Sequence, residues 1–149
     1  MAHVNIGEIH PEAYKAILTL GKAVHEATTD AGLEQKLLEL VRIRVSQLNG
    51  CAFCLRMHTR DALKAGEAAD RLAVVAAWWE SQYFTDQERA ALQLAENVTL
   101  QSDYAHLSDH GVDPSQFLDE KQISAITWLI IELNAWNRVA VSSHYPVGP

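Results

Sequence analysis

The chain has 149 residues, of which 19 are acidic and 12 are basic, giving a formal net charge of −7. A chain of this length buries a core without disulfides or metals to hold it together, so we expect a single domain over 1–149. The acidic balance, without a Lys/Arg cluster, argues against a protein that binds phosphate backbones, and we expect no nucleic acid partner.

No stretch of the sequence has the features of a secretory signal or a membrane span. Segment 1–18 lacks a basic flank followed by an apolar run and a small-residue cleavage site. The most apolar stretch, 123–136, contains Glu132 and falls short of the roughly 20 apolar residues that cross a bilayer. We therefore expect a cytoplasmic protein that does not associate with membranes.

Helical periodicity runs through most of the chain. The predicted helices cover about 11–30, 33–48, 51–66, 85–100 and 119–141, with a further helix that carries Leu72, Val75, Ala76 and Trp79. Pro11 and the Asp113-Pro114 pair indicate helix starts, and the sequence TDQE from Thr85 is typical of a capping box. No alternating run is long enough for a strand, so the predicted fold is all-α, a compact bundle of roughly six or seven helices.

The last predicted helix, 119–141, is apolar on more than one face. Trp128, Ile130, Ile131 and Trp136 are distributed around its circumference. Such a helix either contributes to a subunit interface or is buried on all sides at the centre of the bundle, and the pattern allows both.

The cysteines of the chain, Cys51 and Cys54, stand three residues apart at the start of a predicted helix, and His58 follows one turn later. At 100° per residue these side chains share one arc with small apolar residues. Residues at this spacing can form a disulfide with little backbone movement. The free N–H groups of a first helical turn also favour a thiolate. The spacing thus predicts a sheltered site in which His58 can exchange a proton with a sulfur.

Two other interpretations of the cysteines stay open. Free cysteine is among the most buried residue types, so the pair can be structural. Cys51, Cys54 and His58 also offer three ligands for zinc, which needs a fourth. Three residues are candidates for that fourth ligand: His106, His110 and Glu39.

The remaining polar residues are interpreted from their position on the predicted helices. Glu39 lies away from the apolar stripe of its helix, so composition predicts a surface carboxylate with no link to the thiols. Arg44 lies inside that stripe and should need a carboxylate partner. His106 and His110 fall in a polar loop and are expected to be solvated.

The stretch ELVRIRVSQLNGCAFCLRMHTRDALKAGE, with the later LNAWNRVAVSSH, resembles the carboxymuconolactone decarboxylase superfamily. Within it, the sequence is similar to the alkylhydroperoxidase branch typified by the alkylhydroperoxide reductase D protein, AhpD. The likeness extends from about Leu33 to His144, with the motif core over about 33–100. Its motif is a Glu, eleven residues and then C-x-x-C-x-x-x-H, which Glu39, Cys51, Cys54 and His58 match.

The resemblance implies an all-helical subunit in a homotrimer or homohexamer, and a thiol peroxidase that needs no cofactor. It implies that Cys54 attacks an organic hydroperoxide, that Cys51 resolves the sulfenic acid as a disulfide, and that Glu39 and His58 relay protons. An external dithiol would reduce the disulfide; in the best-known members this is a lipoyl group on a partner protein.

One position departs from the pattern of the best-known peroxidases, which carry a second His inside the motif. Here that residue is Phe53, which falls on the arc opposite the thiols and is expected to serve in packing. Two alternatives to the peroxidase remain: a redox-sensing or zinc-binding module without turnover, and a decarboxylase or lactone-type enzyme of the same superfamily that does not use the cysteines.

Overall fold

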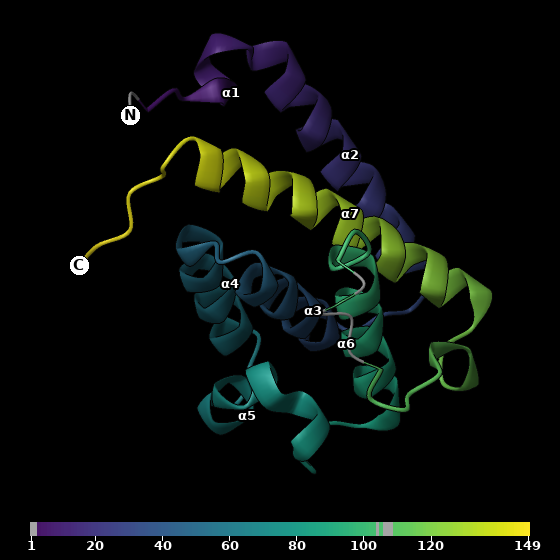
Figure 1. Cartoon of the computed structure of the whole chain (residues 1–149). Helices are drawn as coiled ribbons and strands as arrows, with labels where there is room; N and C mark the ends of the chain where they lie inside the picture. The colour runs from purple at the N-terminus through teal and green to yellow at the C-terminus, as the bar shows by residue number, and fades with distance from the viewer. Residues whose placement is uncertain (1–2, 104, 106–108) are drawn as a thin grey trace.

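The computed structural model describes residues 3–103, 105 and 109–149, and within these residues it contains helices and no strand (Figure 1). The elements are, in chain order: α1 Ile6–Ile9, α2 Pro11–Asp30, α3 Gln35–Leu48, α4 Ala52–Lys64, α5 Ala69–Ala73, the 3-10 helix η1 Val75–Glu80, α6 Asp86–Thr99, the 3-10 helix η2 Pro114–Gln116, and α7 Glu120–Ser142. The predicted all-α class is confirmed.

Helix starts follow the expected local signals. Pro11 occupies the first turn of α2. Thr85 caps α6 in a reciprocal capping box with Glu88, and Asp119 caps α7 in the same way. The helix predicted after Asp113 is only the 3-10 turn η2, whose cap accepts a hydrogen bond from the backbone of Ser115.

The predicted fourth helix is wrong as a continuous element, because it divides into α5 and η1. The chain leaves α-helical geometry at Val74, between α5 and η1, and again inside η1 at Ala77, where φ is −131° and ψ is 39°. The break at Ala77 turns the Trp78 ring into the core, where it is fully buried and its indole N–H donates to Glu96 at 2.8 Å. The single turn α1 was not predicted, since four residues are too few to show a helical period.

Helix α7 occupies the middle of the molecule, with α2 along one side and α3 and α6 on the other (Figure 1). The main core lies between these helices and includes Val41, Ile126 and Leu129. Trp128 is nevertheless 50% exposed and Ile131 is 40% exposed. The alternative in which this helix is buried on all sides is therefore wrong.

A second cluster lies where α3 meets α6 and η1. The guanidinium of Arg44 donates to Glu96 through Nε at 2.9 Å and Nη2 at 2.8 Å, which confirms the expected carboxylate partner. His110 also contacts Glu96 at 3.1 Å and stacks on Trp79, so the prediction of a solvated side chain is wrong for this residue. His106 lies outside the described residues.

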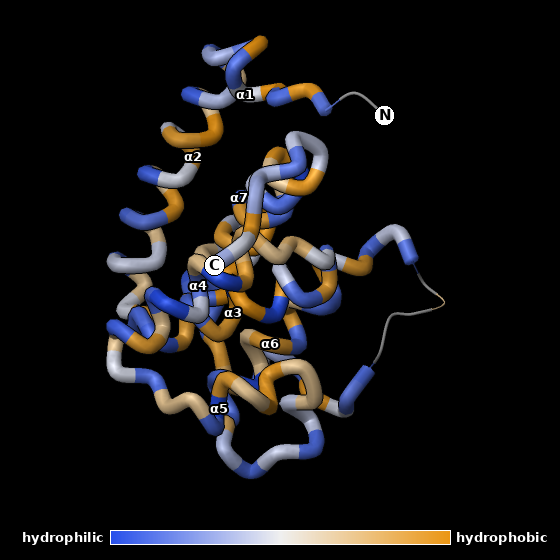
Figure 2. The backbone as a smooth tube through the Cα atoms, turned by 90° about the vertical axis from the view of Figure 1, so that its left-hand side faces the viewer, coloured by the Kyte–Doolittle hydropathy of each residue, from blue (hydrophilic) through white to orange (hydrophobic). Residues whose placement is uncertain are grey.

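Helices α1 and α2 form an arm that runs along α7 and stands apart from α5 and α6 (Figure 2). Only Val24 and Thr28 of α2 are buried. In the described part of the chain, no helix combines the length and the hydrophobicity needed to cross a membrane.

Candidate active site

The two cysteines lie at the junction between α3 and α4. Gly50 has a φ of +64°, the left-handed conformation that glycine adopts without strain, and it ends α3. Cys51 is the N-cap of α4, and its sulfur accepts a hydrogen bond from the backbone N–H of Cys54 at 3.3 Å. Both thiols are free and buried, and their sulfur atoms are 2.6 Å apart. The local turn thus brings the two sulfurs face to face.

The environment of Cys54 opposes ionisation of its thiol. Burial and the neighbouring Cys51 raise the pKa of Cys54 to about 12, and hydrogen bonds from Asn137 and the backbone offset only part of the rise. The backbone N–H at the start of α4 therefore lowers the pKa of Cys54 as expected, but desolvation raises this pKa by more. Cys54 needs a base to become a nucleophile near neutral pH.

His58, whose neutral imidazole can accept a proton, lies one turn along α4. His58 is buried, and its Nδ1 lies 3.1 Å from Oε2 of Glu39 on α3. Burial would raise the pKa of Glu39, but the hydrogen bond from His58 and the charge of Arg42 outweigh it and lower the pKa. An ionised Glu39 can only accept hydrogen bonds, so Nδ1 of His58 carries the hydrogen and donates a hydrogen bond to the carboxylate. In the neutral imidazole the lone pair is then on Nε2. Among the described residues, Nε2 is buried and has no hydrogen-bond partner.

The prediction of Glu39 as a surface carboxylate is wrong. Its side chain is 2% exposed, because α4 packs across the face of α3 that carries it. Its second oxygen, Oε1, accepts from Nε2 of Gln35 at 2.7 Å and from Nη1 of Arg42 at 2.6 Å. Three donors from two helices thus fix the carboxylate against His58.

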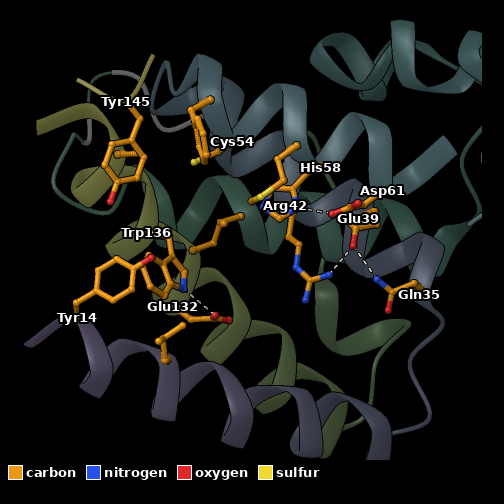
Figure 3. A pocket seen from close by; sticks show the side chains of 15 residues that line it. Tyr14, Gln35, Glu39, Arg42, Cys54, His58, Asp61, Glu132, Trp136 and Tyr145 are labelled. Carbon is orange, nitrogen blue, oxygen red and sulfur yellow. Dashed lines mark hydrogen bonds and ion pairs between the residues drawn. The ribbon is translucent and has the colours of Figure 1, made fainter. Parts of the chain in front are cut away.

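A pocket of about 610 Å³ brings these groups together (Figure 3). Helices α2, α3, α4 and α7 and the C-terminal segment supply its walls. Its polar residues are Gln35, Glu39, Arg42, Cys54, His58, Asp61 and Glu132, and its apolar and aromatic residues include Tyr14, Leu18, Phe53, Met57, Leu133, Trp136 and Tyr145. Cys51 instead lines a separate cavity of about 180 Å³ beneath the C-terminal segment. Of the two cysteines, Cys54 therefore faces the space that a substrate of some size can enter.

Phe53 has a different place from the one predicted. It is half-buried and lines the same pocket as Cys54, with its ring packed edge-on against Tyr145 at a centroid distance of 5.2 Å. The helical wheel placed it opposite the thiols, but the C-terminal segment folds back over α4 and encloses it with them. Phe53 is thus part of the pocket wall.

Several polar residues of the site were not predicted from the sequence. Asn137 of α7 donates to Ser46 at 3.2 Å and accepts from Asn49 at 2.9 Å, which ties α7 to the end of α3 beside Cys54. Arg42 donates a hydrogen bond to Glu39, and Glu132 brings a further carboxyl group into the pocket. The isolated polar residues within the apolar last helix were the available signal for Glu132 and Asn137.

The described residues gather one set of candidate metal ligands: Glu39, His58 and Asp61 place one ligand atom each within 4.8 Å of one another. Neither cysteine belongs to this set, which differs from the zinc site considered above. Arg42 already lies 2.6 Å from Oε1 of Glu39, so its positive charge opposes the binding of a cation at this carboxylate. His110, another of the predicted zinc ligands, instead contacts Glu96 through Nε2 at 3.1 Å.

Sequence comparison relates the chain to a known family. Residues 11–97 match the model of the carboxymuconolactone decarboxylase family. The uncharacterized protein YdfG of Bacillus subtilis is 35% identical over 139 residues, which cover 93% of this chain and 92% of YdfG. The uncharacterized protein YnjA of Escherichia coli is 34% identical over 68 residues, which cover 46% of this chain and 37% of YnjA.

Two solved structures share the fold. ATU0492 from Agrobacterium tumefaciens, a protein of unknown function with a suggested identity as the antioxidant defence protein AhpD, has a TM-score of 0.84 at 31% identity, covering 99% of this chain and 100% of ATU0492. The debrominase Bmp8 has a TM-score of 0.67 at 19% identity, covering 89% of this chain and 76% of Bmp8, and shows the fold alone. These matches confirm the resemblance read from the Glu39 to His58 motif: the chain belongs to the carboxymuconolactone decarboxylase family, in its AhpD-like branch.

Proposed function

We propose that the protein is a thiol-dependent peroxidase that reduces organic hydroperoxides through a disulfide cycle of Cys54 and Cys51. One observation carries the proposal: Cys54 shares a pocket with the Glu39–His58 pair, and its sulfur lies 2.6 Å from that of Cys51. This arrangement supports roles for Cys54 as the nucleophile, for His58 as the base and for Cys51 as the second thiol of this chemistry. The aromatic and apolar pocket wall favours an organic hydroperoxide over hydrogen peroxide.

In the first step Nε2 of His58 accepts the proton of the Cys54 thiol, and Glu39 stabilises the imidazolium through Nδ1. The thiolate then attacks the terminal oxygen of the hydroperoxide. An S–O bond forms and the O–O bond breaks, so that the sulfur is oxidised to a sulfenic acid and the peroxide is reduced to an alcohol, with one proton required by the departing alkoxide.

In the second step the Cys51 sulfur attacks the sulfenic sulfur of Cys54. A disulfide forms, the S–O bond breaks, and the thiol proton of Cys51 leaves with the hydroxyl group as water. The short distance between the sulfurs favours this step over further oxidation by a second peroxide.

An external dithiol must then reduce the disulfide through a mixed disulfide. Since Cys51 is 1% exposed and Cys54 is 2% exposed, we propose that this reductant enters as a slender group through the pocket, as a lipoyl group on a partner protein would. We also propose a homotrimer or homohexamer. The exposed Trp128 and Ile131 on α7 support a subunit interface at this face.

The test is thiol titration of the purified protein before and after one equivalent of cumene hydroperoxide. We expect two titratable thiols per chain to fall to none. Cys54→Ser should abolish peroxide turnover, and Cys51→Ser should accumulate a sulfenic acid that a dimedone probe traps.

Three results would contradict this assignment. Full peroxidase activity in both single variants would exclude the disulfide cycle. A decarboxylase or lactone-type activity that survives loss of both cysteines would identify the other branch of the superfamily. Stoichiometric zinc in protein purified without added metal, lost in the cysteine variants, would identify the metal-binding module.

A further inference from the structure

Glu132 is a half-buried carboxyl group of the pocket that the cycle above leaves without a role. Glu132 enters from α7, whereas Glu39 and His58 belong to α3 and α4 (Figure 3). Its Oε1 accepts a hydrogen bond from Nε1 of Trp136, one turn along the same helix, at 3.1 Å. The carboxyl group is thus fixed in the pocket wall.

The opposing helix leaves space for this carboxyl group. A Cβ atom at Gly21 of α2 would lie 2.7 Å from Oε1 of Glu132, so a side chain there would push the end of Glu132 out of its present position. The absence of a side chain at this position allows Glu132 to remain between α2 and α7. Both Arg42 and His58 are near enough to influence it electrostatically.

The pKa values of Glu39 and Glu132, two of the three carboxyl groups that line the pocket, are shifted in opposite directions. Burial raises the pKa of Glu132, and the hydrogen bond from Trp136 and the charges of Arg42 and His58 only reduce the rise. Hydrogen bonding and charge lower the pKa of Glu39, as described above. The environment of Glu39 lowers its pKa, and the environment of Glu132 raises its pKa. Such a divergence within one site is typical of a base and an acid that act in the same reaction.

We propose that Glu132 is the general acid of the peroxidase reaction and protonates the alkoxide that leaves when Cys54 attacks the hydroperoxide. This inference rests on the proposed function. In it, the two proton transfers of the peroxidase reaction take place at two different walls of the pocket. His58 and Glu39 remove the proton from the nucleophile on the α3–α4 side, and Glu132 supplies one to the leaving group from α7.

The proton balance closes over one turnover. The Cys54 proton moves to Nε2 of His58, the S–O bond forms as the O–O bond breaks, and the alkoxide takes the proton of the Glu132 carboxyl group to leave as an alcohol. The imidazolium of His58 then returns its proton, through solvent in the pocket, to the carboxylate of Glu132. No oxidant or reductant beyond the hydroperoxide and the thiol is needed.

The test compares two oxidants that differ in leaving group. tert-Butyl hydroperoxide releases a strongly basic alkoxide that needs a proton, whereas peracetic acid releases acetate, which does not. Pre-steady-state loss of thiols is followed by rapid quench in the parent protein, in Glu132→Gln, and in Glu120→Gln as a matched Glu-to-Gln replacement at an exposed position of the same helix. We expect Glu132→Gln to slow the reaction with tert-butyl hydroperoxide about 100-fold and to leave the reaction with peracetic acid unchanged. Glu120→Gln should match the parent protein with both.

A leaving-group dependence cannot arise from a general structural defect, which would slow both oxidants together. Glu132→Asp, which retains a carboxyl group, should recover part of the rate with tert-butyl hydroperoxide and keeps the test decisive if the amide variant folds poorly. The role of Glu132 would be overturned if Glu132→Gln reacts as fast as the parent protein with both oxidants, or if it is slowed by the same factor with both. If the parent protein loses no thiols with either oxidant, the proposed peroxidase function itself is wrong.

Discussion

Replacing Glu39 by Gln tests whether the carboxylate sets the protonation state of His58. Three donors converge on this group: the side-chain N–H groups of Gln35 and Arg42 on Oε1, and Nδ1 of His58 on Oε2. An amide offers one acceptor oxygen and one NH₂ group. If its oxygen stays with Gln35 and Arg42, the NH₂ group faces Nδ1, and His58 must accept there and carry its proton on Nε2.

That tautomer has no lone pair directed away from residue 39, so the base for Cys54 is lost. General base catalysis contributes about 10²–10⁴ to a rate, and we expect a loss of about 10³ in the second-order rate of Cys54 oxidation at pH 7. The raised pKa of Cys54, about 12, gives the variant a characteristic pH dependence. Its thiolate arises only by equilibrium with solvent, so its rate should climb about tenfold per pH unit through neutrality, more steeply than that of the parent protein.

Stopped-flow measurement with cumene hydroperoxide from about pH 6 to about pH 9.5 checks both expectations. Glu34→Gln is the matched control, since Glu34 is exposed at the start of the same helix and makes no side-chain capping bond. If Glu39→Gln reacts within about threefold of the parent protein over this range, the carboxylate does not control the base, and the reasoning from the three donors is refuted.

The remaining predictions concern stability and assembly. Arg44→Met leaves Glu96 buried without its guanidinium, and should lower the free energy of unfolding in urea by about 3 kcal/mol; adding Glu96→Gln should restore part of this loss. Burial raises the pKa of Glu132, so its ionisation in the folded chain costs stability once the pH exceeds the ordinary value of 4.5. Glu132→Gln should therefore raise the Tm at about pH 8 and not at about pH 4, and an equal shift at both would contradict this linkage. Trp128→Lys should reduce the mass measured by light scattering if α7 forms the subunit interface; an unchanged oligomer would place the interface elsewhere.

Local signals in the sequence predict most of the helices correctly. Pro11 and the Thr85–Glu88 capping box mark helix starts where the structure has them, because caps and helical periods depend on residues a few positions apart. The prediction of a continuous helix around Ala77 is wrong because the interaction that decides it is not local. Burying Trp78 against Glu96 of another helix outweighs the local preference for a continuous helix, and a pattern read along one segment does not contain that partner.

By itself, the sequence determined the all-α class and the pairing of Cys51, Cys54 and His58 on one face of one helix, since these follow from spacing within a single element. Only the tertiary structure decided that Glu39 is buried against His58, and that α2, α3, α4 and α7 enclose one pocket with Glu132 in its wall. The physical reason is that desolvation and hydrogen bonding at these carboxyl groups come from other helices. The packing of those helices, rather than the identity of each residue's neighbours in the chain, shifts the pKa values of the two glutamates in opposite directions.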